Sequence, residues 1–266
     1  MDRRQGPRIG VRGLWRRGRA LRPPRPHGGA THVKKTAGKN PWARFAGKPL
    51  VAPSLLAADF MHLADQIATV IGAGAEILHV DVMDGHFVPN LAISPGVTRS
   101  IRRGCGHFLD AHLMVTDPLF FAEPFIKAGV DSITFHVESD SDPRRMIAAL
   151  RQAGVGVGIT VKPGTSAETV RPYAGEVDLV LVMTVEPGYG GQAFMADQVD
   201  KIRAVRDIVG PSVRVEVDGG IDADTVVRCV EAGADTFVAG ASVFGADDIP
   251  AAVKALKRSI ASARAR

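Results

Sequence analysis

The chain has 266 residues, of which 45% are hydrophobic, enough to build the core of one large domain or two small ones. Its net charge of +5 is unevenly placed, because residues 1–49 hold 14 Lys or Arg and a single acid, Asp2, whereas the remainder is net acidic. No run approaches the roughly 18 apolar residues of a membrane span, and the two cysteines match no metal or redox spacing, so we expect neither a membrane protein nor a disulfide scaffold, and a reduced, cytoplasmic setting.

The basic N-terminal segment is rich in Arg, Gly and Pro without a repeating period, and we expect residues 1–48 to be disordered. Such a segment could tether nucleic acid, lie on a membrane surface or direct targeting. A secretory signal needs an apolar stretch and a transit peptide is usually Ser-rich, whereas residues 1–49 contain no serine. We therefore favour plain disorder, or an extension that is not translated, ahead of a domain formed by residues 49–266.

From Pro49 onward, short apolar runs alternate with amphipathic helical patterns, such as Phe60, Leu63, Ile67 and Ile71. Each pair of run and helix takes roughly 25 to 35 residues, the size of a βα unit. Several helical patterns end on Ala-Gly, the expected helix stop, at Gly129, Gly154 and Gly233. The eight expected strands are Leu50–Ser54, Ala75–Asp81, Phe108–Met114, Ser132–Val137, Val155–Val161, Leu179–Val185, Val213–Val217 and Thr236–Val243.

Eight such units predict an α/β protein of the (β/α)8 barrel class, while a doubly wound open sheet fits less well. The polar residues favour the barrel. His79, Asp81, His112 and Asp218 lie toward the C-terminal ends of expected strands 2, 3 and 7, where barrels place their active sites. Closure of a barrel would also bring strand 7 within reach of strand 2.

The stretch from Ile77 to Asn90 places two polar groups inside an apolar strand. His79 and Asp81 are two residues apart, so they share a face, and a buried carboxylate beside an imidazole is costly unless it is paired or bound to a metal. With His112 and Asp218, they form a plausible set of N and O ligands for one divalent cation: Zn, Fe, Mn or Co. A metal-free hydrogen-bonded cluster is the alternative.

Methionines and glycines accompany these strand ends. Met83, Met114 and Met183 could form a water-excluding wall, although each taken singly is an ordinary core residue. Glycines follow strands 6, 7 and 8, at Gly188, Gly190, Gly191, Gly219, Gly220 and Gly240. Each alone would mark a tight turn, but their joint placement at one end of a barrel indicates loops that bind phosphate through exposed backbone N–H groups.

Five ordered motifs carry a resemblance to a known family. They are APSLLAADF from Ala52, HVDVMDGHFVPN from His79, DAHLMV from Asp110, MTVEPGYGGQAF from Met183 and VDGGI from Val217. From about residue 50 to about residue 250 the chain resembles ribulose-phosphate 3-epimerases. The resemblance implies a metal-dependent barrel enzyme that interconverts D-ribulose 5-phosphate and D-xylulose 5-phosphate in the pentose phosphate pathway or Calvin cycle. It also implies a homo-oligomer.

The same resemblance implies roles for single residues. Asp81 corresponds to the proton acceptor and Asp218 to the proton donor, and both are metal ligands together with His79 and His112. The substrate-binding positions implied are Ser54, His112, Gly188, Tyr189, Gly190, Gly191, Asp218, Gly219, Gly220, Gly240 and Ala241. Where many relatives resemble VAGSAVF this chain reads VAGASVF, so Ala241 offers phosphate only its backbone N–H, with Ser242 adjacent.

Other functions stay open at this point. A sister epimerase acting on allulose 6-phosphate would use identical chemistry. A sister decarboxylase usually has Asp-x-Lys-x-x-Asp after a strand, but the stretch from Asp81 to Asp84 has no lysine. We expect His136 and Glu138 to be structural or to support the site residues from behind. We expect Lys162 to be solvated or to pack against its neighbours rather than to form a Schiff base. A protein tethered to nucleic acid through its basic segment is the non-enzymatic alternative.

Overall fold

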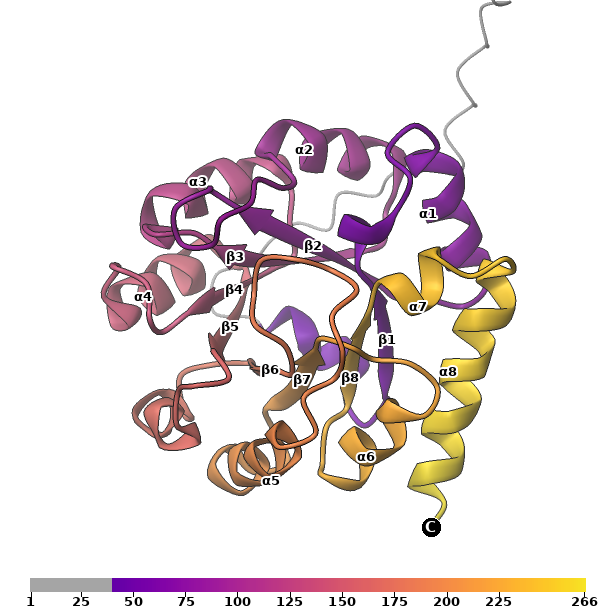
Figure 1. Ribbon diagram of the computed structural model, residues 1–266. Coiled ribbons are helices and arrows are strands. Elements are labelled where there is room, and N and C mark those ends of the chain that lie inside the picture. Colours follow the sequence, from indigo (N-terminus) through magenta and orange to yellow (C-terminus); the bar gives the residue numbers. More distant parts are fainter. Residues whose placement is uncertain (1–39) are drawn as a thin grey trace, which may run out of the picture.

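The computed structural model describes residues 40–266, and the expectations for residues 1–39 lie outside it. Eight parallel strands form a barrel that helices surround on the outside (Figure 1). The strands are β1 Leu50–Pro53, β2 Ile77–Met83, β3 Phe108–Met114, β4 Ser132–His136, β5 Gly156–Val161, β6 Leu179–Met183, β7 Arg214–Asp218 and β8 Thr236–Ala239. The helices are α1 Leu63–Gly72, α2 Pro95–Gly104, α3 Pro118–Ala128, α4 Pro143–Ala153, α5 Gln198–Val209, α6 Thr225–Glu231, α7 Ala241–Phe244 and α8 Ile249–Arg264, with 3-10 turns η1 Pro41–Phe45, η2 Leu55–Ala57 and η3 Ala167–Tyr173.

The strand order settles the choice between the two predicted architectures. The hydrogen-bonded order runs β1-β8-β7-β6-β5-β4-β3-β2, and a parallel bridge between Ser54 and His79 joins its two ends. The sheet therefore closes on itself, as the (β/α)8 prediction requires, and the doubly wound alternative is excluded. Closure places β7 only three strands from β2 around the barrel, which is what brings distant parts of the sequence to one mouth.

The helix ends follow the local sequence. Asp117 and Asp142 accept backbone N–H groups at the starts of α3 and α4, each followed by a proline that has no N–H to satisfy. Gly129 and Gly154 end the same helices in the left-handed conformation, with φ of 103° and 66°. These two glycine stops are confirmed, and they return the chain to the start of the next strand.

The expected eighth strand is wrong at its C-terminal end. It was expected to extend to Val243, but β8 ends at Ala239, and α7 begins at Ala241 after Gly240 takes φ −101° and ψ −90°. The apolar run that predicted a strand belongs instead to a helical turn that buries Val243 and Phe244. Apolar runs of this length fit either structure, because periodicity alone cannot separate a buried strand from a buried helix turn.

The predicted disorder is wrong for the last residues of the basic segment. Residues 41–45 form η1, whose Trp42 and Phe45 are buried at the N-terminal end of the barrel. Trp42 packs on Phe108 with ring centroids 4.5 Å apart, and its Nε1 donates to Ser132 Oγ at 3.0 Å. Residues 41–45 therefore belong to the fold, because two aromatic side chains supply apolar area that composition alone did not reveal.

Candidate active site

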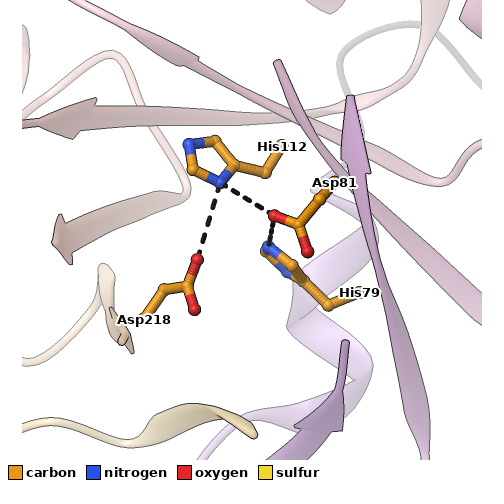
Figure 2. Close-up of side chains that lie close together, drawn as sticks. All are labelled: His79, Asp81, His112 and Asp218. Atoms are coloured by element: carbon orange, nitrogen blue, oxygen red, sulfur yellow. Dashed lines mark ion pairs between the residues drawn. The ribbon is translucent and has the colours of Figure 1, made fainter. Parts of the chain in front are cut away.

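Four side chains at the C-terminal end of the barrel point toward one place. His79 and Asp81 extend from β2, His112 from β3 and Asp218 from the end of β7 (Figure 2). Asp81 Oδ1 lies 3.5 Å from His79 Nε2 and 3.4 Å from His112 Nδ1. Asp218 Oδ2 lies 3.7 Å from His112 Nδ1, and one ligand atom from each residue lies within 4.8 Å of the others. The convergence expected from strand periodicity is therefore present.

The donor atoms suit a divalent cation better than a hydrogen-bonded cluster. Within the described part of the chain, His79 Nε2 and His112 Nδ1 are buried and have no hydrogen-bond partner. Separations of 3.4 to 3.7 Å are too long for hydrogen bonds. They match the spacing of about 3.4 Å between two ligands that each bind one tetrahedral ion at about 2.1 Å. The four residues thus fit the predicted cation, and the metal-free alternative accounts less well for them.

Burial and neighbouring charges shift the pKa values of the ionisable groups in this cluster in different directions. Burial and the nearby Asp81 carboxylate together raise the pKa of Asp218 to about 6. Burial alone would also raise the pKa of Asp81, but the positive charge of the neighbouring His79 and His112 imidazoles holds it below its usual range. Burial opposes a charge on His79, yet Asp81 and Asp110 raise its pKa well above the ordinary value. The site therefore gathers negative charge that a proton or a cation neutralises.

Ser54 fixes the orientation of Asp81. Its Oγ donates to Asp81 Oδ2 at 2.5 Å, while the same oxygen accepts the backbone N–H of Leu56 at 3.3 Å. This leaves Asp81 Oδ1 as the oxygen that faces the two imidazoles. Sequence resemblance assigned Ser54 to substrate contact, and the structure places it both on the pocket wall and behind the carboxylate.

A cavity of about 670 Å³ opens directly above the four side chains. The predicted site residues that line it are Ser54, Asp81, Met83, Met114, Met183, Gly188, Tyr189, Gly190, Gly191, Asp218, Gly219, Gly220, Gly240 and Ala241. His79 and His112 are not among the lining residues and are fully buried. The predicted substrate contact of His112 is thus not visible at the wall, and its Nδ1, which faces Asp81 and Asp218, is itself buried.

The loop after β7 needs its two glycines. Gly219 and Gly220 have φ of 125° and 64°, which side chains rarely adopt. A Cβ on Gly219 would lie 2.5 Å from Val185 Cγ2, and one on Gly220 would lie 2.5 Å from the backbone nitrogen of Phe194. The loop therefore packs against the β6 loop so closely that only glycine fits, and its backbone reaches the cavity.

The loop after β6 reaches across to the loop after β2. Tyr189 Oη donates to the carbonyl of Pro89 at 2.7 Å, and Asn90 Nδ2 donates to the carbonyl of Gly188 at 2.8 Å. These two hydrogen bonds, which we call the clasp, join residues about 100 positions apart in sequence. The loop after β6 is thus held near the cavity by contacts that the sequence did not reveal.

The order Ala241-Ser242 just after β8, where many relatives resemble Ser-Ala, has a specific local consequence. Ser242 Oγ donates to the carbonyl of Ile221 at 2.6 Å, so its proton is engaged by the β7 loop. Ala241 lies exposed at the cavity with no hydroxyl to offer. Ser242 therefore does not replace a hydroxyl donor at Ala241, and the backbone remains the only donor at that position.

Two buried carboxylates near the site were not singled out from the sequence. Asp110 Oδ2 lies 3.1 Å from His79 Nδ1, and Glu216 Oε1 lies 3.8 Å from the same nitrogen. Both are fully buried, and burial, with the charge of Asp110, raises the pKa of Glu216 well above its usual value. A signal for them existed: each stands two residues before a predicted ligand, His112 or Asp218, and so shares its strand face.

The residues considered for other chemistry lie beside the cavity. His136 Nε2 lies 3.0 Å from His112 Nε2, and His136 Nδ1 lies 3.2 Å from Glu138 Oε2. Lys162 is half-buried with its Nζ 3.8 Å above the Phe87 ring and is not among the residues that line the cavity. The placement of Lys162 agrees with packing and offers no support for a Schiff base.

Comparison with known proteins identifies the family. A family model described as the ribulose-phosphate 3 epimerase family matches residues 50–244. The chain belongs to this family. A ribulose-phosphate 3-epimerase from Mycobacterium tuberculosis is 48% identical over 220 residues, covering 82% of this chain and 95% of the relative. The relative from Oryza sativa subsp. japonica, named as a cytoplasmic isoform, is 44% identical over 79% of this chain and 93% of its own length.

Solved structures with low sequence identity share the fold. A 3-keto-L-gulonate-6-phosphate decarboxylase from Vibrio cholerae matches with a TM-score of 0.63 at 16% identity, covering 81% of this chain and 98% of that one. At this identity the likeness speaks for the barrel alone. Within residues 40–266, no helix combines the length and apolar character that crossing a membrane requires.

Proposed function

We propose that the protein is a metal-dependent epimerase that interconverts D-ribulose 5-phosphate and D-xylulose 5-phosphate. Family membership and the names of the relatives support the substrate. The observation that carries the mechanism is the meeting of Asp81 and Asp218, whose carboxylate oxygens lie within 4.8 Å of each other at the floor of the cavity.

The reaction requires two such groups. Epimerisation at C3 removes a proton beside the C2 ketone and returns a proton to the opposite face of the same carbon. Asp81 on β2 and Asp218 on β7 approach from different sides of the barrel mouth (Figure 2). Starting from D-ribulose 5-phosphate, Asp81 takes the proton and Asp218 supplies the other, and the two roles exchange in the reverse direction.

His79, Asp81, His112 and Asp218 are the residues that would hold the cation. When bound there, a divalent metal supplies positive charge beside the oxygens on which negative charge develops as the proton leaves. The N and O donors suit Zn, Fe, Mn or Co. Ser54 keeps Asp81 turned toward this position through its hydrogen bond to Oδ2.

The rest of the cavity orients the sugar and excludes water. The backbone of Gly219, Gly220, Gly240 and Ala241 would bind the phosphate, because glycine loops at this end of a barrel expose N–H groups. Met83, Met114 and Met183 are buried and form an apolar wall next to the carboxylates. Holding the phosphate at a distance from the acids fixes C3 between them.

Hydrogen exchange from D₂O tests the two roles separately. With D-ribulose 5-phosphate, Asp81→Asn should abolish deuterium entry at C3, whereas Asp218→Asn should permit entry but block epimerisation. With D-xylulose 5-phosphate the two variants should exchange behaviour. Metal content is measured for each variant, so that loss of the cation is not mistaken for loss of a base. Equal effects of both variants on exchange from both substrates, at full metal content, would contradict the assignment.

Two further properties belong to the same proposal. A cytoplasmic location is supported by the name of the rice relative and by the lack of a membrane-spanning helix in the described part. A homo-oligomer stays a prediction from family resemblance. Light scattering of the purified protein would give the number of chains.

A further inference from the structure

His112 is the first member of a chain of three buried or half-buried side chains. Its Nδ1 faces Asp81 and Asp218, and its Nε2 lies 3.0 Å from His136 Nε2. The second nitrogen of His136, Nδ1, lies 3.2 Å from Glu138 Oε2. His112 and His136 sit on neighbouring strands β3 and β4, are fully excluded from solvent, and stack with ring centroids 5.0 Å apart.

The order of donors along this chain follows from the chemistry of imidazole. A nitrogen that binds a metal does so through its lone pair, so a neutral His112 that ligates through Nδ1 carries its hydrogen on Nε2. That hydrogen can only be donated to His136 Nε2, which must therefore be an acceptor. The hydrogen of a neutral His136 is then on Nδ1, where the carboxylate of Glu138 accepts it.

The far end of the chain is fixed in place. Glu138 Oε1 accepts the backbone N–H of Lys162 at 2.8 Å, which leaves Oε2 for His136. Phe87 also packs on the His136 ring, with centroids 4.7 Å apart. Both imidazoles are fully buried, so the direction of donation follows from the partners at their nitrogens.

We propose that His136 and Glu138 are positioning residues that select the tautomer and ring orientation of His112 in which Nδ1 is free to bind the cation. The inference rests on the metal site of the proposed function. It differs from the arrangement at His79, whose outer nitrogen meets Asp110 directly at 3.1 Å. At His112 the carboxylate acts through a second imidazole. Hydrogen bonds to the outer nitrogen of a ligand histidine commonly change metal affinity by about 10- to 100-fold when removed.

Affinity for Zn²⁺, measured on the full chain by competition with a chromophoric chelator, tests the positioning role. His136→Leu fills the space but accepts no hydrogen bond, and we expect it to weaken Zn²⁺ binding about 10- to 100-fold. His136→Gln offers an amide oxygen to His112 and should recover most of that loss. Thr160→Val is the matched control, because Thr160 is the register neighbour of His136 on β5, is fully buried, and has a side-chain oxygen without a hydrogen-bond partner in the described part. It should bind Zn²⁺ within about twofold of the unaltered protein.

Affinity for His136→Leu equal to that of the control would overturn the proposal, and so would equal losses in His136→Leu and His136→Gln, since shape alone would then matter. ¹⁵N NMR of the unaltered Zn²⁺-loaded protein gives a measurement that needs no variant. We expect the hydrogen on Nε2 of His112 and on Nδ1 of His136. A hydrogen on Nε2 of His136 would refute the proposed positioning role. None of these measurements uses the sugar substrate, so failure of the positioning role and failure of the epimerase assignment remain distinguishable.

Discussion

The two ends of the barrel differ in how their buried polar groups are satisfied. At the N-terminal end, Trp42 and Phe45 close the cylinder over Phe108, and Arg214 donates to the carbonyls of Phe45 and Lys48 and to Asp235. At the C-terminal end, His79 and His112 each keep one buried nitrogen without a hydrogen-bond partner among the described residues. Aromatic packing and hydrogen bonds therefore close the N-terminal end, whereas the C-terminal end keeps two ring nitrogens available to bind a ligand.

This difference shows where stability and function lie in the molecule. A buried polar atom without a partner costs about 1–3 kcal/mol, so the mouth is held in place by the packing of the rest of the barrel. Substitutions at the mouth should therefore remove activity without loss of stability, and substitutions at the bottom should do the reverse. Each of the following variants is aimed at one side of that contrast.

The largest effect is expected at the mouth. Asp218→Asn removes an acid-base group and a charged ligand, and we expect the turnover number to fall by about 10³-fold or more. The metal-free variant should unfold at the same temperature as the metal-free unaltered protein or higher, because the change relieves repulsion between buried carboxylates. A coupled assay and calorimetry measure the two quantities. Turnover within tenfold of the unaltered protein would contradict the role of Asp218.

The bottom of the barrel should respond in the opposite sense. Trp42→Ala removes a side chain that is 2% exposed and should lower the free energy of unfolding by about 3–5 kcal/mol. Turnover per folded molecule should change less than threefold, since η1 lies at the opposite end of the barrel from the cavity. Phe120→Ala, at a side chain that is 70% exposed, is the matched control and should leave unfolding nearly unchanged. Equal stability of the two variants in urea would show that η1 does not close the barrel.

The smallest effect is expected at the clasp. Tyr189→Phe keeps the ring but loses the hydrogen bond to Pro89, worth about 0.5–1 kcal/mol at a half-exposed site. We expect KM to rise about two- to fivefold with little change in unfolding temperature. Steady-state kinetics measure it, and an unchanged KM together with an unchanged kcat would mean that the clasp does not hold the loop in the working enzyme.

Much of this arrangement could be predicted from the sequence because the signals were local. The alternation of apolar runs and helical patterns gave eight units, and the strand period of two put His79 and Asp81 on one face. Closure of eight strands then implied that Asp218 would meet them. The glycines after β7 were also informative, since their backbone conformation and close packing permit no other residue.

The parts that escaped prediction depend on contacts between distant segments. Trp42 lies in a stretch whose composition indicates disorder, and only its packing on Phe108 at the N-terminal end of the barrel makes it a core residue. The hydrogen bond from Tyr189 to Pro89 and the contact of His136 with His112 depend on the folded positions of two loops and two strands. Ser242 is adjacent to Ala241 in the sequence, but only the structure shows that its hydroxyl donates to the carbonyl of Ile221.

The most direct test of the account is metal removal and return. After exhaustive chelation, the protein should epimerise D-ribulose 5-phosphate at less than about 1% of its original rate, and one equivalent of Zn²⁺, Mn²⁺, Fe²⁺ or Co²⁺ per chain should restore it. Binding of one ion and recovery of activity should follow the same titration curve. Full activity in protein shown by elemental analysis to be free of metal would contradict the assignment of His79, Asp81, His112 and Asp218 as the ligands of an essential cation.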